Sequence, residues 1–339
     1  RALFLVGCVV LGCLAVMMAV FADRTQQAFA LLVAPWHWAP FLVTPAGFAV
    51  SAYLTRRFFP GAQGSGIPQV IAARKLDGLE ARSRLVSLRL AAAKIGLLML
   101  GLLCGASSGR EGPTVQVGAA TMAVLGRLEP HRQPGLLLAG SAAGIAAAFN
   151  APLAGIIFGI EEMSRSFEQR SSVLVLVTVI AAGLTSLTLL GNYTYFGTGH
   201  GAMLAGWQWL SVPIVLLVGG LLGGIFSRFV IAIAHGGVPQ GLATLVRNYP
   251  VVFAAACGLL VAICGLLSDN STFGTGYAQA QAILDAHPMP WLFGPLKLVA
   301  TALSTVSGIP GGIFSPSLSV GAGIGYNLSA LLPGVPIDT

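Results

Sequence analysis

Two charged side chains that could do chemistry, Arg110 and Glu111, stand side by side in the stretch GREGP at residues 109–113. A carboxylate can accept and release a proton. The surrounding sequence is strongly apolar, and an ionised side chain at the centre of a membrane costs about 2.5–3.5 kcal/mol even on the gentler insertion scales. Two interpretations follow: Glu111 forms a surface ion pair with Arg110, or it has a function that needs a carboxylate at that depth.

Two further stretches share the design of GREGP, namely GSGIP at 64–68 and GGIFSP at 311–316. In each, glycines precede a proline that can open an apolar helix, and proline suits the first helical turn because its missing N–H would have no partner there. Glycine lets the backbone approach a ligand closely. The first N–H groups of a helix are unpaired and lie at the positive end of its dipole. If three such helix starts converge, they form an anion site made of partial charges, which releases an anion more readily than a full charge does.

The elements that position these stretches are expected to be membrane helices. The chain of 339 residues is 55% hydrophobic and only 9% charged, whereas soluble domains carry about 25% charged residues. Long apolar runs such as 173–190 and 212–234 lack the alternation of a membrane β-barrel. The composition therefore predicts an all-α polytopic membrane protein. The expected apolar helices are 2–21, 39–54, 90–105, 113–126, 134–148, 151–162, 172–190, 212–234, 250–267, 291–306 and 313–332.

Several of these segments are shorter than the roughly 20 residues needed to cross the hydrocarbon core. The chain has 44 glycines and 19 prolines, many of them at the ends of the short segments. Helices of this kind stop partway through the membrane and line a site with their ends, since unpaired backbone is tolerated there only within protein or around a polar cavity. Close helix packing through glycine is the alternative, but it does not explain prolines at the helix starts.

The chain also repeats itself. Shifted by 203 residues, KIGLLMLGLLCGASSGREGPTVQVGAA from Lys94 falls on KLVATALSTVSGIPGGIFSPSLSVGAG from Lys297, and GSGIP has a weaker partner in GTGYA at 274–278. Two repeats with helices broken at matching places are typical of transporters with a central site. We expect one membrane domain over 1–339, with a first repeat at about 1–195 and a second at about 205–339.

The termini carry two expectations of their own. The first copy continues through AAFNAPLAGIIFGIEEM at 147–163, and its counterpart would begin past residue 350, beyond Thr339. We therefore expect the second repeat to be truncated at its C-terminus. Because the chain opens with Arg1 rather than methionine, we also expect sequence upstream, and we interpret 2–21 as a membrane helix rather than a signal peptide.

The charge pattern predicts an orientation and excludes several classes of protein. The net charge is +7, and many basic residues gather in 72–89. Between membrane segments such a cluster indicates a cytoplasmic loop and not a nucleic-acid surface. The five cysteines lie in apolar segments and are expected to be small hydrophobic fillers, and the five histidines show no metal-binding spacing. We expect neither a metal nor a cofactor. Lys94 lies among apolar residues, and structural pairing is favoured over contact with an anion.

Four of these stretches together resemble the signature sequences of the CLC chloride channels and chloride/proton exchangers: GSGIP, GREGPTVQVG, FNAPLAGIIFGIEEM and GGIFSP. The resemblance covers roughly residues 40–332. It implies a CLC-type fold of tilted, partly broken helices in two inverted halves. It also implies a homodimer with a pore in each subunit, in the inner membrane of a bacterial cell.

The resemblance further implies a set of site residues. Ser65 would offer its hydroxyl to a central chloride, with Gly66, Ile67 and Gly112 beside it. The backbone N–H groups of Ile313 and Phe314 would face the same anion from the second repeat. The alternatives are a plain helix cap for Ser65 and core packing for Phe314. The family also supplies a tyrosine hydroxyl, for which no matching position exists before Thr339.

Two glutamates would carry protons in a protein that resembles this family. Glu111 would act as gate and proton carrier, because its carboxylate can occupy the place meant for chloride and leave it when protonated. Arg110 would lie near the outer vestibule. Glu162 would deliver protons from the inner solution, the alternative being that Glu161 and Glu162 are simply solvated near Arg165.

The sequence therefore predicts a chloride/proton antiporter, with chloride and protons as substrates and the lipid bilayer as surroundings. A passive chloride channel of the same fold is the first alternative. An intramembrane hydrolase is a second, but it would need a Ser/His or paired-aspartate arrangement at membrane depth, and we expect no enzyme. The serine of GSGIP resembles the chloride-preferring form of the motif, and fluoride-specialised relatives depart from these motifs.

Overall fold

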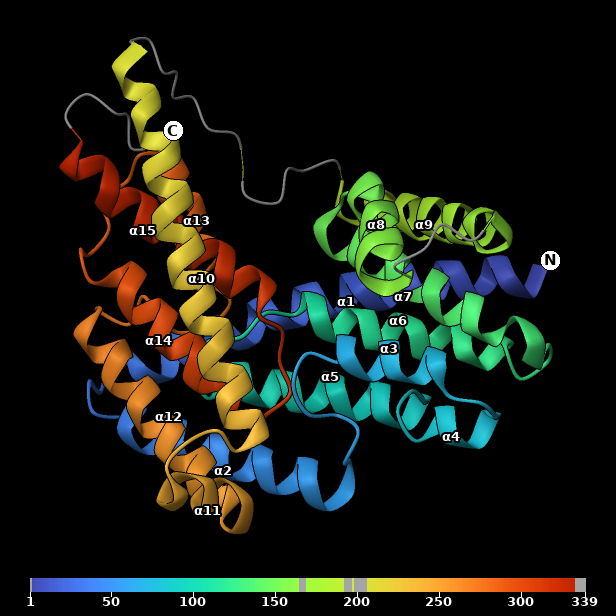
Figure 1. Cartoon of the computed structure of the whole chain (residues 1–339), viewed down its shortest axis with the longest axis horizontal. Coiled ribbons are helices and arrows are strands. Elements are labelled where there is room, and N and C mark those ends of the chain that lie inside the picture. Colours follow the sequence, from blue (N-terminus) through green and yellow to red (C-terminus); the bar gives the residue numbers. More distant parts are fainter. Residues whose placement is uncertain (1, 165–168, 192–196, 198–205, 333–339) are drawn as a thin grey trace.

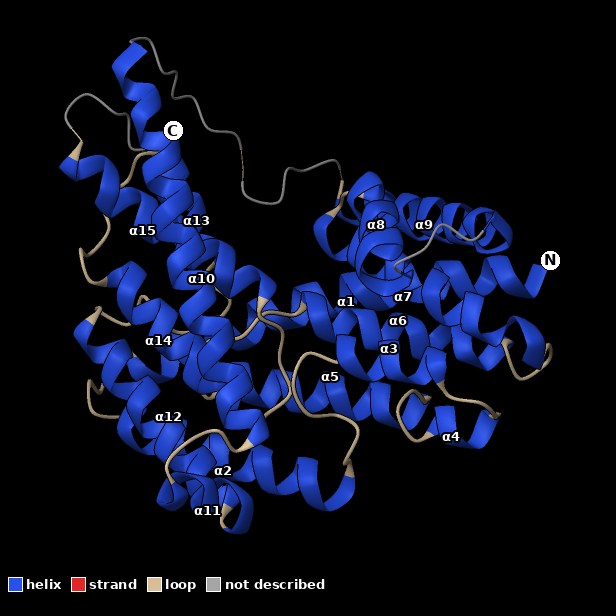
Figure 2. Ribbon diagram, in the orientation of Figure 1, coloured by secondary structure: helices blue, strands red, loops and turns tan. Residues whose placement is uncertain are grey.

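The computed structural model describes residues 2–164, 169–191, 197 and 206–332, and within these ranges the regular elements are helices (Figure 2). The apolar segments expected from the sequence are present with small shifts at their ends. The helices are α1 (Ala2–Val33), α2 (Pro40–Phe58), α3 (Ile67–Lys75), α4 (Leu79–Ser83), α5 (Leu88–Leu103), α6 (Glu111–Leu125), α7 (Gln133–Phe149), α8 (Pro152–Phe158), α9 (Gln169–Leu190), α10 (Ser211–His235), α11 (Gln240–Asn248), α12 (Pro250–Leu267), α13 (Tyr277–Leu284), α14 (Phe293–Val306) and α15 (Phe314–Leu331). A π-helical turn, Gly159–Ser164, follows α8.

The long helices have the length and the exposed apolar surface of membrane spans. Five of them are long and apolar enough to cross a bilayer: Ala2–Val33, Leu79–Leu103, Val173–Leu190, Gly206–His235 and Pro250–Leu267. On α10, Leu216 and Leu217 are 72% and 70% exposed. Such side chains suit contact with lipid hydrocarbon, where apolar surface carries no penalty, so the chain is an integral membrane protein.

Most of the helices fall into two groups (Figure 1). In this view α3 to α9 lie to the right and α10 to α15 to the left, with α2 beside α12. One apolar core is built around α1, α6, α7 and α9 and includes Leu11, Met18 and Leu137. A second core includes Phe48 of α2, Phe253 of α12 and Ile309.

Glycine serves close packing in the first group. An added Cβ at Gly118 of α6 would lie 2.3 Å from the Gly140 carbonyl oxygen of α7, and one at Gly140 would lie 2.3 Å from the Gly118 oxygen. The two backbones therefore touch at this crossing, as small residues allow in membranes. Glycine packing and broken helices occur together in this chain.

Two expectations about helix extent need correction. The first helix does not end near residue 21 but continues through Asp23 to Val33, and Asp23 pairs at 3.2 Å with Arg110, the residue before α6. The second concerns three short helices, α4, α11 and α13, which are not among the expected apolar segments. Of these, α13 has eight residues and follows GTG at 274–276. It is short and carries two glutamines, so its sequence has no strong apolar signal.

One end of the first group is basic. Arg82 of α4 donates to Gln133 at the start of α7 at 2.9 Å, and the Arg74 guanidinium donates to the carbonyl of Met163 after α8. These contacts gather three segments, 72–89, 126–133 and 159–163, which we call the basic end. It contains the loop predicted to be cytoplasmic from its positive charge.

Candidate functional site

The three glycine-rich segments converge where the two groups of helices meet. Gly109 and Gly312 exchange backbone hydrogen bonds of 2.7 Å in both directions. Gly64 donates to the Ile309 carbonyl at 3.2 Å and accepts from the Gly311 N–H at 3.0 Å. The starts of α3, α6 and α15 are therefore tied together by backbone contacts, as the sequence predicted.

Glycine at position 112 is needed for this close approach. An added Cβ there would lie 2.9 Å from the Ser65 Cβ and 3.4 Å from the Gly312 Cα. Gly66 precedes α3 with φ 92°, a left-handed conformation that side chains rarely adopt. Both positions thus bring backbone N–H groups to one place without side chains between them.

Ser65 lies at the start of α3 and is half-buried. Its hydroxyl oxygen accepts a hydrogen bond from the Ile67 N–H at 3.3 Å. Ser65 therefore caps the start of α3, as one of the two interpretations expected. A hydroxyl that accepts one hydrogen bond can still donate its own proton. Capping of α3 and donation to an anion are therefore compatible.

Phe314 has two environments that sequence reasoning treated as alternatives. Its ring packs edge-on against Phe149 and Phe158, with centroids 6.5 and 6.1 Å away. Its backbone is the first turn of α15, directly after Ile313. The ring thus belongs to an aromatic cluster with the ends of α7 and α8, while the backbone N–H lies at the convergence.

Glu111 is completely buried, as the first residue of α6. Its Oε2 accepts a hydrogen bond from the Ser315 N–H at 3.4 Å, so the carboxylate lies at the start of α15. An anion at a helix N-terminus is stabilised by the dipole and by the unpaired N–H groups. The carboxylate of one half therefore lies at an anion-binding end of the other half.

Arg110 does not form a surface pair with Glu111, which is the correction the structure makes to that interpretation. Arg110 is 6% exposed, and its guanidinium donates to Asp23 of α1 at 3.2 Å and to the Ala19 carbonyl at 2.8 Å. Asp23 is half exposed. The charge of Arg110 is thus compensated by a carboxylate of α1, and it holds α1 against the start of α6.

Lys94 is buried and pairs structurally, as expected. Its Nζ donates to the Gly64 carbonyl at 2.7 Å and to the Gln63 carbonyl at 3.3 Å. Lys297 is its counterpart in the repeat and donates to the carbonyls of Thr272 and Gly274, both at 2.8 Å. Sequence reasoning gave Lys297 no role, although its register with Lys94 was the available signal.

Gln116 is a second residue whose role the sequence did not reveal. It is fully buried on α6, and its Nε2 donates to the carbonyls of Gly61 and Leu85 at 3.0 and 2.8 Å. It therefore fixes the segments before α3 and before α5. Its Oε1 faces Gly66, where an added Cβ would lie 2.6 Å away.

Glu162 lies at the basic end, far along the chain from Glu111. It is exposed in the π-helical turn, next to buried Met163. Turns of this type recur at functional sites. Phe158 stands one helical turn before Glu162 and contacts Phe314, so a packed aromatic contact lies between the turn and the convergence. Glu161 is exposed as well, and Arg165 falls outside the described residues.

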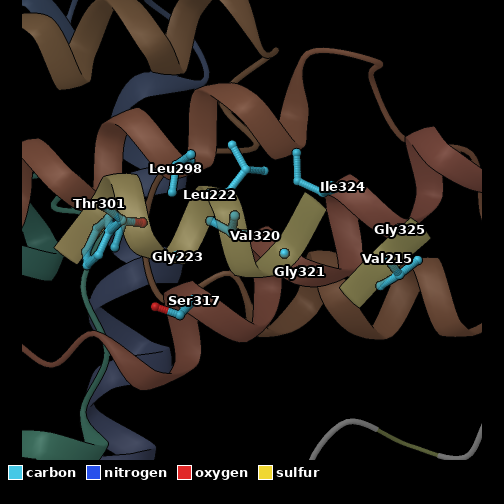
Figure 3. A pocket seen from close by; sticks show the side chains of 12 residues that line it. Val215, Leu222, Gly223, Leu298, Thr301, Ser317, Val320, Gly321, Ile324 and Gly325 are labelled. Carbon is cyan, nitrogen blue, oxygen red and sulfur yellow. The ribbon is translucent and has the colours of Figure 1, made fainter. Parts of the chain in front are cut away.

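A separate cavity of about 170 Å³ lies between α10, α14 and α15 (Figure 3). Its lining is largely apolar and includes Leu222, Leu298 and Ile324. The residues of the convergence do not line it. This cavity is therefore separate from the convergence of the helix starts. In the described part of the chain, no cluster of three His, Cys, Asp or Glu side chains could hold a metal ion.

Comparison with known proteins is informative at this point. Residues 47–338 match the family model described as voltage gated chloride channel. A ClcB-like chloride channel protein of Ralstonia nicotianae is 31% identical over an alignment of 330 residues, which covers 90% of this chain and 72% of that protein. The H(+)/Cl(-) exchange transporter ClcA of Yersinia pseudotuberculosis is 30% identical over 350 residues, covering 94% of this chain and 68% of the relative.

Two solved structures share the fold. A CLC-type fluoride/proton antiporter superposes with a TM-score of 0.79 and 23% identity, covering 99% of this chain and 83% of that one. A slow cyanobacterial Cl-/H+ antiporter gives a TM-score of 0.78 and 23% identity, covering 98% and 80%. The expected fold class, tilted and broken membrane helices, is confirmed by these similarities.

Proposed function

Because the chain belongs to the voltage-gated chloride channel (CLC) family, we propose that it is an antiporter that exchanges chloride for protons. The relatives are named as transporters or channels and not as enzymes, and this chain is a transport protein. The exchange proposal is supported by the relative named as an H(+)/Cl(-) exchange transporter. The observation that carries it is the buried Glu111 carboxylate at the start of α15.

Glu111 is proposed as both gate and proton carrier. Ionised, its carboxylate accepts the Ser315 N–H and fills a place that an anion could fill. Protonated, it is neutral, and its attraction to the positive end of α15 falls. Chloride can then take its place, and the departing side chain carries the proton.

The chloride ligands are proposed to be the donors around the convergence. The Ser65 hydroxyl and the backbones of Gly66 and Ile67 would contribute from the start of α3, and Gly112 from α6. The N–H groups of Ile313 and Phe314 would contribute from α15. Because these are partial charges, chloride would bind strongly enough to enter and weakly enough to leave. No cofactor takes part.

Glu162 is proposed as the inner proton residue. Its exposure at the basic end supports access from the solution on the side predicted to be cytoplasmic. Its separation from the chloride ligands supports two paths that share Glu111 and diverge inward. If Glu162 were merely a solvated surface residue, it would be exposed in the same way. The two interpretations therefore differ only in whether neutralising Glu162 stops proton movement.

A passive chloride channel is the second candidate function, because the ClcB-like relative is named as a channel protein. A channel would let chloride flow without moving protons. The proposal also includes a homodimer in the inner membrane of a bacterium, in keeping with the bacterial relatives. The test that separates an antiporter from a channel is the same whether or not the protein is a dimer and whichever membrane it occupies.

The test is uphill proton movement in liposomes. The purified protein is reconstituted, a chloride gradient is imposed at equal pH on both sides, and external pH is followed. An antiporter drives protons against their own gradient as chloride runs down. Chloride flux without proton movement would establish the channel, and turnover of a lipid or peptide without ion flux would overturn both.

A further inference from the structure

The start of α13 has the same local structure as the start of α3. Gly64 and Gly66 have φ of 59° and 92°, and Gly274 and Gly276 have φ of 72° and 79°. Thr275 accepts from the Tyr277 N–H at 3.4 Å, as Ser65 accepts from the Ile67 N–H at 3.3 Å. Each loop also lies over a buried lysine that holds its carbonyls, Lys94 in one case and Lys297 in the other.

In both loops, a polar oxygen without a hydrogen-bond partner faces the second glycine, Gly66 or Gly276. Within the described part of the chain, Gln116 Oε1 and Ser319 Oγ are buried and have no hydrogen-bond partner. An added Cβ at Gly66 would lie 2.6 Å from Gln116 Oε1, and one at Gly276 would lie 2.4 Å from Ser319 Oγ. The two residues correspond in the repeat. A fully buried hydroxyl without a hydrogen-bond partner is unfavourable, and at Ser319 it is a donor that an anion at the start of α13 could use.

The donors of this loop already hold a neutral stand-in for an anion. Gln26 Oε1 of α1 accepts from the Thr275 N–H at 2.7 Å and from the Thr275 hydroxyl at 3.1 Å. Gln26 is half-buried, so its amide can move outward. A carbonyl oxygen at this place is a weaker acceptor than an ion would be.

The loop lies on the opposite side of Glu111 from the basic end. Helix α1 runs antiparallel to α6, since Gly7 is beside Leu125 at the end of α6 and Asp23 contacts Arg110 at its start. Ser315 links the loop to the gate, because its N–H donates to Glu111 and its hydroxyl donates to the Thr275 carbonyl at 3.3 Å. An ion at this loop would therefore be adjacent to the gate.

We propose that the start of α13, at Thr275–Gly276–Tyr277 with Ser319 behind it, is a second halide site at the mouth opposite the basic end. The Gln26 amide oxygen occupies it until a halide displaces it. This site rests on the proposed chloride transport and adds to it a place where chloride waits before or after Glu111. Its ligands are the Thr275 and Tyr277 N–H groups and the two hydroxyls.

The first test locates bromide by its anomalous scattering in crystals of the native protein. Density at the start of α13, as well as at the central convergence, is the expected result. Ser319→Ala should remove the outer density and keep the central one. Ser317→Ala is the matched control, since Ser317 is on the same helix but exposed, and it should keep both. Central density alone in the native crystals would overturn the second site.

The second test fills the site with a tethered anion. Gln26→Glu places a carboxylate where the amide oxygen now lies, so it should slow chloride flux about tenfold at neutral external pH and relieve this inhibition at acid pH. Asp23, Arg110, Tyr277, Lys297 and Glu111 also face this region, and they are unchanged in the variant. The control is Gln27→Glu, which adds the same charge at an exposed neighbour and should leave the flux and its pH dependence unchanged.

The two tests separate failure of this site from failure of the proposed function. If Gln26→Glu and Gln27→Glu behave alike, the outer site is wrong even where liposomes show coupled exchange. If both bromide densities are present but chloride moves no protons, the antiport proposal fails and the site stands. If bromide appears at neither place while liposomes show coupled exchange, the outer site and the assigned chloride ligands are wrong and the antiport proposal stands.

Discussion

The starts of α6 and α15 correspond in the two halves of the molecule, yet one begins with Glu111 and the other with Phe314. Between them Gly109 and Gly312, which also correspond, exchange two equal hydrogen bonds. The scaffold at the convergence is therefore nearly symmetric, whereas its chemistry is not. One half supplies an ionisable side chain and the other an aromatic ring packed against Phe149 and Phe158. In the proposed exchange, the symmetric frame would bind the anion and the asymmetric residue would couple its movement to a proton.

A second difference concerns packing. Gly118 of α6 touches the backbone of α7, whereas at Gly321, its counterpart on α15, an added Cβ meets nothing within 4 Å in the described chain. The face of α6 at Gly118 is thus tightly packed, whereas the face of α15 at Gly321 is open, although α15 meets the backbone of α14 closely at Gly323. Close packing thus requires a glycine at position 118, whereas it does not require one at the corresponding position 321.

Removing the asymmetric charge has the largest expected effect. Glu111→Gln keeps the shape of the side chain but can neither ionise nor carry a proton. We expect proton movement to be abolished and chloride flux to become independent of pH, measured in liposomes at acid and neutral pH. Glu129→Gln, in an exposed pair with Arg132, is the control. Chloride flux that stays pH-dependent in Glu111→Gln would contradict the gate.

The next effect separates two neighbouring glutamates at the basic end. Glu162→Gln should abolish proton movement and spare chloride flux, because it blocks only the inner proton path. Glu161→Gln is a matched neighbour, exposed in the same turn, and should leave both fluxes intact. If Glu162→Gln and Glu161→Gln have the same proton flux, whether both lose it or both keep it, Glu162 has no special role.

The packing difference predicts a stability contrast. Gly118→Ala forces a Cβ to 2.3 Å from a backbone oxygen that cannot move aside, so it should cost about 3 kcal/mol or more. Gly321→Ala has open space and should be tolerated. Thermal unfolding in detergent measures both. A comparable loss at Gly321 would contradict the difference between the halves.

The buried lysines predict the smallest contrast. Lys94→Met and Lys297→Met each remove a buried Nζ donor that two carbonyls share. The loss should be larger for Lys297→Met, about 1–3 kcal/mol of stability, because the carbonyls of Gln63 and Gly64 also accept from the Gln69 amide and from the Gly311 N–H. Only Lys94→Met should also weaken halide binding at the convergence, because Lys94 holds the carbonyl of Gly64 beside Ser65. Bromide anomalous density at the convergence distinguishes them, whereas calorimetry would also register a loss at the start of α13, where Lys297 holds the Gly274 carbonyl. Equal loss of the central density would count against the assignment of Ser65 to the central site.

Much of this architecture is readable from residue pattern. The apolar runs predict most of the helices, and the Gly–Pro starts predict the convergence, because those residues impose their backbone geometry locally. The pairing of Arg110 with Asp23, of Lys297 with Thr272, and of Gln26 with Thr275 joins residues far apart in the chain. Such contacts depend on how helices pack, and a single sequence carries no record of that. The ring of Phe314 packs against Phe149 and Phe158, as one of the two interpretations expected, and the role of its backbone N–H in binding an anion remains a proposal.

In the proposed mechanism, the Glu111 carboxylate holds a place that a halide would otherwise take. This claim is tested most directly by comparing bromide anomalous density in crystals of the native protein and of Glu111→Gln, grown at the same pH and bromide concentration. The account predicts an additional bromide in Glu111→Gln, within hydrogen-bonding distance of the Ser315 N–H, and none there in the native protein. The same density in both crystals, or none near Ser315 in either, would contradict it.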